Sequence, residues 1–179
     1  MGIDAFGIQH FSEQITKHIT FLLQTRSEEL NYLTSLLKNS TRVFLIGNGG
    51  SHSICEHMAT DLNKRCDINA ITLSSAGYIT CLGNDYGFKN VYREWLKQNI
   101  VDSLDVVVAI SSSGKSKDIT RALKYCNDRG IPAFGISGMD GFDPTTVDYN
   151  IHIDSYNYGE IEMTTEVLLH GIIENELVK

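Results

Sequence analysis

Apolar residues recur along the first forty positions at the spacing of an α-helix. Between residues 8 and 37 they stand three, four or seven positions apart, as Phe11, Ile15, Ile19, Leu23, Leu30, Leu33 and Leu37. This spacing predicts one or two amphipathic helices. Because the stretch precedes the first predicted strand, its apolar stripe is expected to cover either the domain's own sheet or another subunit.

Beyond residue 40 the pattern changes to short β-branched and aromatic runs that alternate with helical stretches. Strands are predicted over residues 43–46, 70–73, 106–110, 133–136 and 149–153, and helices over 117–128 and 161–177. Such continuous apolar runs are typical of parallel strands that are buried on both faces and joined by right-handed crossovers. The predicted fold is α/β, a three-layer doubly wound parallel sheet with an N-terminal helical extension. We expect one domain over residues 1–179, with residues 1–40 as the N-terminal helices and 41–179 as the α/β core and last helix.

Composition excludes several classes of function. The chain has 15 Lys and Arg against 22 Asp and Glu, a formal net charge of -7 that argues against a nucleic-acid partner. It shows neither a signal segment nor an apolar run near the ~20 residues that cross a bilayer, so we expect a cytoplasmic protein without a membrane partner. The four cysteines match neither a metal knuckle nor a disulfide framework and are expected to be reduced thiols.

Two loops at predicted strand ends are suited to hold a phosphate. The first, GNGGS at residues 47–51, opens a helix and has neither the dinucleotide nor the P-loop spacing, so no nucleotide or redox cofactor is expected. A tight turn with a serine cap is the alternative for this loop. The second, SSSGKS at residues 111–116, brings four hydroxyls to the end of the most apolar strand, where hydroxyl and backbone donors suit an anion.

Three segments carry a family resemblance. GNGGS at 47–51 and ISSSGKS at 110–116 resemble the two signature loops of sugar isomerase (SIS) domains, and CLGNDYGF at 81–88 resembles a segment of the phosphoheptose isomerases. The resemblance covers essentially the whole chain. It implies interconversion of sedoheptulose 7-phosphate and manno-heptose 7-phosphate for cell-envelope or capsule sugars, in a homotetramer whose sites are shared between subunits. The substrate-binding positions that it implies are Asn48, Gly49, Gly50, Ser51, Asn84, Asp85, Ser111, Ser112, Ser113, Ser116 and Glu162.

The implied chemistry needs an acid and a base. Aldose–ketose interconversion moves a proton between C1 and C2 through an enediolate. His57 and Asp61 stand four apart on a predicted helix and so share a face. With the family's matching histidine at His170, we predict Asp61 as the base and His170 as the acid. A lone histidine among apolar neighbours is otherwise a core residue, which is the alternative for His170.

A zinc ion is the one cofactor that the sequence suggests. His57, Asp61, Glu162 and His170 offer nitrogen and carboxylate ligands that zinc accepts, and some members of the family carry zinc there. On a regular helix Glu162 and His170 are about 12 Å apart at ~1.5 Å per residue, so joint ligation requires an irregular helix start near Gly159.

Three positions depart from the family pattern. Asp61 stands where the family usually has glutamate, Glu162 stands where it has glutamine, and Gly159 lies nearest to the place of an expected aspartate. Two other functions remain open at this level. One is a non-catalytic SIS regulator that binds a phosphosugar or a protein, although the presence of His170 favours an enzyme. The other is an isomerase of another ketose, such as a hexulose phosphate.

Overall fold

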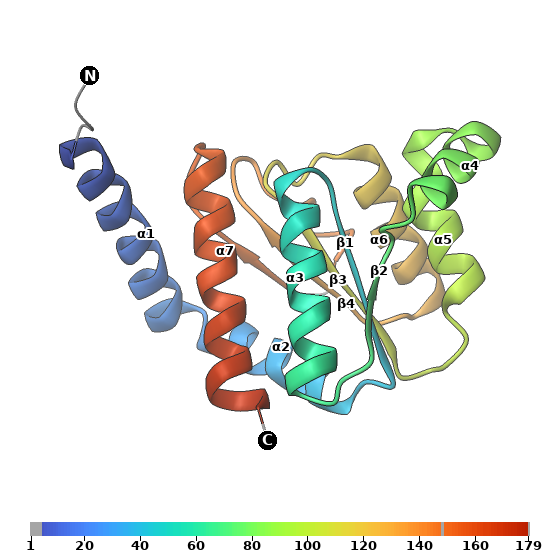
Figure 1. Cartoon of the computed structure of the whole chain (residues 1–179), viewed down its shortest axis with the longest axis horizontal. Helices are drawn as coiled ribbons and strands as arrows, with labels where there is room; N and C mark the ends of the chain where they lie inside the picture. The colour runs from blue at the N-terminus through green and yellow to red at the C-terminus, as the bar shows by residue number, and fades with distance from the viewer. Residues whose placement is uncertain (1–4, 148, 179) are drawn as a thin grey trace.

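A central parallel sheet organises the computed structural model, which describes residues 5–147 and 149–178 (Figure 1). Its strands stand in the order β2-β1-β3-β4-β5, and each neighbouring pair is parallel. They are β1 (Arg42–Gly47), β2 (Ala70–Thr72), β3 (Asp105–Ser111), β4 (Ala133–Ser137) and β5 (Tyr149–His152). The predicted α/β class is confirmed, and each predicted strand forms within one or two residues of its expected ends.

Helices cover both faces of the sheet. One face carries α2 (Ser27–Asn39), α3 (Gly50–Arg65) and α7 (Tyr158–Ile172), and the other carries α4 (Ala76–Tyr86), a short 3-10 turn η1 (Phe88–Asn90), α5 (Val91–Asn99) and α6 (Lys117–Arg129). Side chains alternate along β1, so that Val43 and Leu45 join the first apolar cluster while Phe44 and Ile46 join the second. The three predicted layers are therefore present.

The N-terminal stripe forms two helices, α1 (Ala5–Thr25) and α2, with a break at Arg26. In Figure 1 α1 lies at the edge of the molecule beside α7, on the side of α7 away from α3. Leu22 of α1 reaches the core, whereas Phe6 and Ile8 are 79% and 61% exposed. The stripe thus covers α7 in part and leaves large apolar side chains uncovered.

The last predicted helix changes character near its end. Helix α7 runs to Ile172 and is followed by a π turn, η2 (Ile173–Leu177). Asn157 caps its start, because its side-chain oxygen accepts hydrogen bonds from the backbone N–H groups of Gly159 and Glu160.

Across residues 5–147 and 149–178, no helix combines the length and apolar character that spanning a membrane requires.

The strand order reverses between β1 and β3, which places a crevice at their carboxyl ends. The two strands are in register, with Gly47 of β1 opposite Ile110 of β3. Consequently the GNGGS loop and the serine loop, although more than sixty residues apart in sequence, leave the sheet side by side.

Candidate functional site

A cavity of about 340 Å³ lies between these two loops. Its lining is Asn48, Gly49, Gly50, Ser51, Ile110, Ser111, Ser112, Ser113, Ser116, Tyr158 and Glu162. Nine of the positions predicted to bind substrate are in this set. We call this space the loop cavity. Tyr158 was not predicted to line the site. The one signal in the sequence was that Tyr158 lies at the start of the same helix as Glu162.

Polar groups are left available along the loop cavity. The hydroxyl of Ser111 is buried without a hydrogen-bond partner among the described residues, and Ser116 at the start of α6 makes no capping hydrogen bond. In the first loop Gly49 occupies the N-cap position of α3 with a φ of 57°, so the alternative of a serine cap is wrong. Two helix N-termini and several hydroxyls therefore meet at one cavity, an arrangement suited to an anion.

Gly114 holds the serine loop against the neighbouring loop. Its φ is +64°, and a Cβ built there would lie 2.1 Å from the carbonyl carbon of Gly141. The side chain of Lys115 ion-pairs with Asp140 at 2.6 Å on the exposed side of this contact. The charge of Lys115 is therefore engaged outside the loop cavity, whose lining does not include it.

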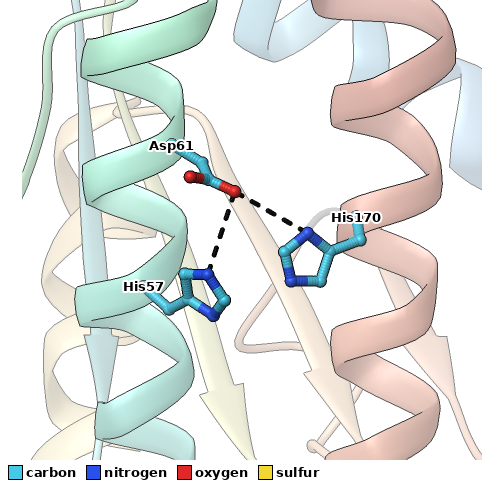
Figure 2. Close-up of side chains that lie close together, drawn as sticks. All are labelled: His57, Asp61 and His170. Atoms are coloured by element: carbon cyan, nitrogen blue, oxygen red, sulfur yellow. Dashed lines mark ion pairs between the residues drawn. The ribbon is translucent and has the colours of Figure 1, made fainter.

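Further along α3 and α7, three side chains converge from the two helices (Figure 2). His57 Nε2 lies 3.9 Å and His170 Nδ1 lies 3.7 Å from Oδ2 of Asp61. The centroids of the two imidazole rings are 4.8 Å apart. The side chain of His170 is 32% exposed, so the alternative of a buried core histidine is wrong.

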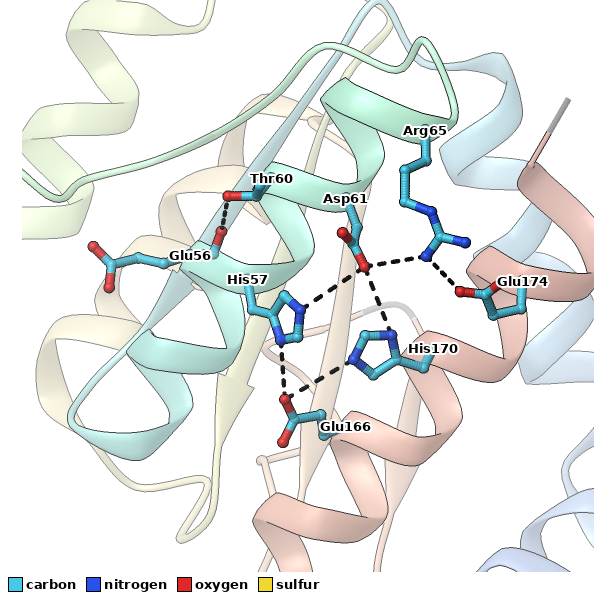
Figure 3. A network of polar contacts seen from close by, with 8 residues as sticks. All are labelled: Glu56, His57, Thr60, Asp61, Arg65, Glu166, His170 and Glu174. Atoms are coloured by element: carbon cyan, nitrogen blue, oxygen red, sulfur yellow. Dashed lines mark hydrogen bonds and ion pairs between the residues drawn. The ribbon is translucent and has the colours of Figure 1, made fainter.

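Glu166 completes this group and was not predicted as a site residue (Figure 3). Its Oε1 lies 3.1 Å from His57 Nδ1 and 4.0 Å from His170 Nε2. Because a carboxylate at Nδ1 orients an imidazole, Glu166 leaves the Nε2 of His57 directed at Asp61. The signal in the sequence was the four-residue spacing from Glu162 through Glu166 to His170. We call His57, Asp61, Glu166 and His170 the helix-pair cluster.

Arg65 borders the helix-pair cluster on the side of Asp61. Its Nη1 lies 3.5 Å from Asp61 Oδ2, and it also ion-pairs with Glu174 (Figure 3). The hydrogen bond from Arg65 lowers the pKa of the Glu174 carboxyl below its ordinary value. Asp61 thus lies beside two imidazoles and one permanent cation.

The helix-pair cluster fits a metal ion in part. One ligand atom from each of His57, Asp61 and His170 lies within 4.8 Å of the others. Ligands bound to zinc at about 2.1 Å in tetrahedral geometry stand about 3.4 Å apart, so modest side-chain rotation would suffice. Three protein ligands with an open fourth position are typical of catalytic zinc.

Glu162 does not join that group. Its carboxylate lies against Gly50, where a Cβ would stand 2.4 Å from Oε1. Because α7 is regular from Tyr158 onward, the irregular start that shared ligation with His170 required is not present. The structure therefore places Glu162 on the wall of the loop cavity, apart from His57, Asp61 and His170, and its role as a fourth metal ligand stays a prediction.

Asn84 and Asp85 lie elsewhere. They occupy the end of α4, are exposed, and hydrogen-bond to each other at 3.0 Å. Neither lines the loop cavity, so this chain by itself does not bring these two predicted residues to the site.

A second space of about 230 Å³ adjoins the loop cavity and shares Asn48 and Gly49 with it. Its other lining residues are Gly47, His52, Ile79, Phe88, Val91 and Tyr92. We call it the side cavity. Asn48 thus lines both spaces.

Comparison with known proteins gives concordant matches. The model of the SIS domain family matches residues 10–138. A phosphoheptose isomerase of Escherichia coli O7:K1 is 31% identical over 157 residues, which are 82% of this chain and 81% of that protein. The solved phosphoheptose isomerases of Neisseria gonorrhoeae and Francisella tularensis each give a TM-score of 0.82, at 23% and 19% identity. These matches cover 97% of this chain and 98% and 97% of those chains, and at such identities they show the fold.

Proposed function

The chain belongs to the SIS-domain family and is related to the phosphoheptose isomerases, and on that premise we propose that it is an aldose–ketose isomerase of a sugar phosphate. The family assignment made from the three sequence segments is thereby confirmed. The proposed substrate pair is sedoheptulose 7-phosphate and manno-heptose 7-phosphate. The observation that carries the proposal is that α3 and α7 each contribute residues both to an anion-suited cavity and to an acid–base cluster.

The phosphate is proposed to bind at the serine loop. Ser111, Ser112, Ser113 and Ser116 supply hydroxyls there, and the first turns of α3 and α6 supply backbone N–H groups. In a chain with a net charge of -7, short-range donors of this kind hold a dianion without a large positive field.

The spacing of the two parts supports a long substrate. From Gly50 to His57 along α3 is about 10 Å at 1.5 Å per residue. An extended ketose phosphate spans a length of this order between its phosphorus and its carbonyl carbon. A phosphate in the loop cavity would thus leave the carbonyl end of the sugar near the helix-pair cluster.

The proton transfers are assigned to Asp61 and His170. In the ketose-to-aldose direction Asp61 takes the proton from C1 while His170 donates a proton to the carbonyl oxygen at C2, which gives the enediol. The proton on Asp61 then returns to C2 as His170 takes back a proton from the oxygen at C1. Glu166 holds the His57 ring, and Arg65 keeps positive charge beside Asp61.

A bound zinc ion is proposed at His57, Asp61 and His170, where it would polarise the substrate's carbonyl or hydroxyl oxygen. The imidazoles and the carboxylate are ligand types that zinc prefers, and Glu166 supplies the outer carboxylate that orients one imidazole.

A homotetramer is proposed as the assembly. Its support is the exposed apolar surface of α1, along which Phe6, Ile8, Phe21 and Leu23 are each more than half exposed. Large uncovered apolar side chains on one helix are typical of a subunit interface. A neighbouring subunit would also be the source of contacts that Asn84 and Asp85 do not make within this chain.

The test is turnover by the purified protein with a panel of ketose phosphates of five, six and seven carbons. NMR should detect formation of an aldose phosphate, with the seven-carbon substrate fastest. Binding of sugar phosphate without any such product would refute the isomerase and support the regulator instead. Absence of binding would refute both.

A further inference from the structure

Asp118 is a buried carboxylate that joins the two loops of the loop cavity. It lies in the first turn of α6, two residues after the serine loop, and is 4% exposed. Its Oδ2 accepts a hydrogen bond from Asn48 Nδ2 at 2.8 Å. Asn48 follows β1 and Asp118 follows β3, so this bond spans the crevice at the point where the strand order reverses.

The bond fixes which end of the Asn48 amide faces a ligand. A side-chain amide has a donating NH₂ and an accepting oxygen, whereas an ionised carboxylate only accepts. A flipped amide would place its oxygen against the Asp118 carboxylate, which is repulsive. Asn48 is therefore held with its NH₂ toward Asp118 and its Oδ1 directed away from it.

Two further features fix this arrangement. Asp118 stands in the first turn of α6, where an acidic side chain interacts favourably with the helix dipole. On the other side of Asn48, the Tyr92 hydroxyl donates a hydrogen bond to the carbonyl oxygen of Gly47 and so fixes the adjoining backbone. Asn48 is consequently held from both sides where it lines the loop cavity and the side cavity.

We propose that Asp118 is a positioning residue that makes Asn48 an acceptor for a sugar hydroxyl and not a donor for the phosphate. The inference rests on the proposed function, because it concerns the same sugar-phosphate site. A phosphate dianion offers acceptor oxygens alone and gains nothing from the Asn48 carbonyl, whereas a hydroxyl donates to it. The bond therefore sets the direction of the substrate, with the phosphate at the serines and the hydroxyls at Asn48.

The experiment compares two phosphates by titration calorimetry. Heptitol 7-phosphate has the hydroxyls of the proposed substrate but no carbonyl to isomerise, and n-butyl phosphate has the phosphate without hydroxyls. In Asp118→Ala the Kd for the heptitol phosphate should rise roughly tenfold, the effect of one hydrogen bond, while that for butyl phosphate changes less than twofold. Asp128→Ala, at the exposed end of the same helix, is the matched control and should change neither.

The exchange variant Asn48→Asp with Asp118→Asn is the decisive second measurement. The new amide on α6 would donate to the new carboxylate after β1, whose other oxygen still accepts, so the preference for the heptitol phosphate should return to within about threefold of wild type. An exchange variant no better than Asp118→Ala, or an Asp118→Ala protein that weakens both ligands equally, would overturn the inference. A wild-type protein that binds neither phosphate refutes the proposed function itself, which is a distinguishable result.

Discussion

Replacing His170 with asparagine separates chemistry from folding in this protein. The side chain of His170 is 32% exposed, and its contacts to Asp61 and Glu166 are 3.7 and 4.0 Å long. Surface substitutions of this kind change the free energy of unfolding by about 0.5 kcal/mol or less. We therefore expect His170→Asn to melt within a few degrees of wild type and to bind inorganic phosphate with unchanged affinity.

Turnover should behave differently. Loss of a general acid or base costs about 100-fold to 10,000-fold in rate, or roughly 2.7 to 5.4 kcal/mol of transition-state stabilisation. The assay is the rate of aldose phosphate formation, followed by NMR with and without saturating zinc. Because the loop cavity does not include His170, the loss should fall on kcat more than on phosphate affinity.

His57→Asn is the matched control, since its ring lies at a similar distance, 3.9 Å, from the same oxygen of Asp61. If both histidines serve as metal ligands alone, the two variants should lose equal activity. We expect His170→Asn to be slower by a further tenfold or more at saturating zinc. Equal losses, or a large fall in melting temperature for His170→Asn, would refute the assignment of His170 as the acid.

Three other changes test the loops and the core. Ser113→Ala should weaken phosphate binding by roughly 1.5 to 3 kcal/mol in calorimetry, and unchanged binding would remove the serine loop from the site. Gly114→Ala should lower the melting temperature more than Gly130→Ala. Both glycines have a φ near +65°, but of the two only position 114 has a backbone atom close to the added Cβ. Equal losses of melting temperature would show that the strained φ alone, and not the close contact, causes the destabilisation. Burial raises the pKa of the Asp105 carboxyl, but hydrogen bonds from an arginine and two backbone N–H groups outweigh it and hold the pKa below normal. That stabilisation is present above the unfolded pKa of about 3.9 and is lost as pH falls through the folded pKa. The difference in melting temperature between wild type and Asp105→Asn should therefore shrink below about pH 4. A difference that stays constant with pH would contradict this reasoning.

The sheet and both loops could be predicted from sequence because their signals are local. The central strands β1, β3 and β4 contain continuous apolar runs, and the loop residues follow strand ends directly, so parallel topology brings Asn48 and Ser113 to one edge. The strands and the loops could each be predicted from residues that are close together in the sequence.

Glu166 and the position of Glu162 depend instead on how α3 packs against α7. Helical spacing shows that Glu162, Glu166 and His170 share a face, but not which of them meets His57. That choice follows from the axial offset of the two helices, which is a tertiary property. Asn84 and Asp85 were placed at the site by family resemblance alone, and no pattern within their own segment indicated a cavity.

The close approach of Gly114 to Gly141 has a kinetic consequence. A loop whose backbone already contacts its neighbour loses little conformational entropy when an anion binds. Binding therefore needs no preceding rearrangement of the loop. Association should then be a single step, with an observed rate that rises linearly with ligand concentration and does not level off. Differences in affinity among phosphorylated ligands would consequently lie in their dissociation rate constants and not in their association rate constants.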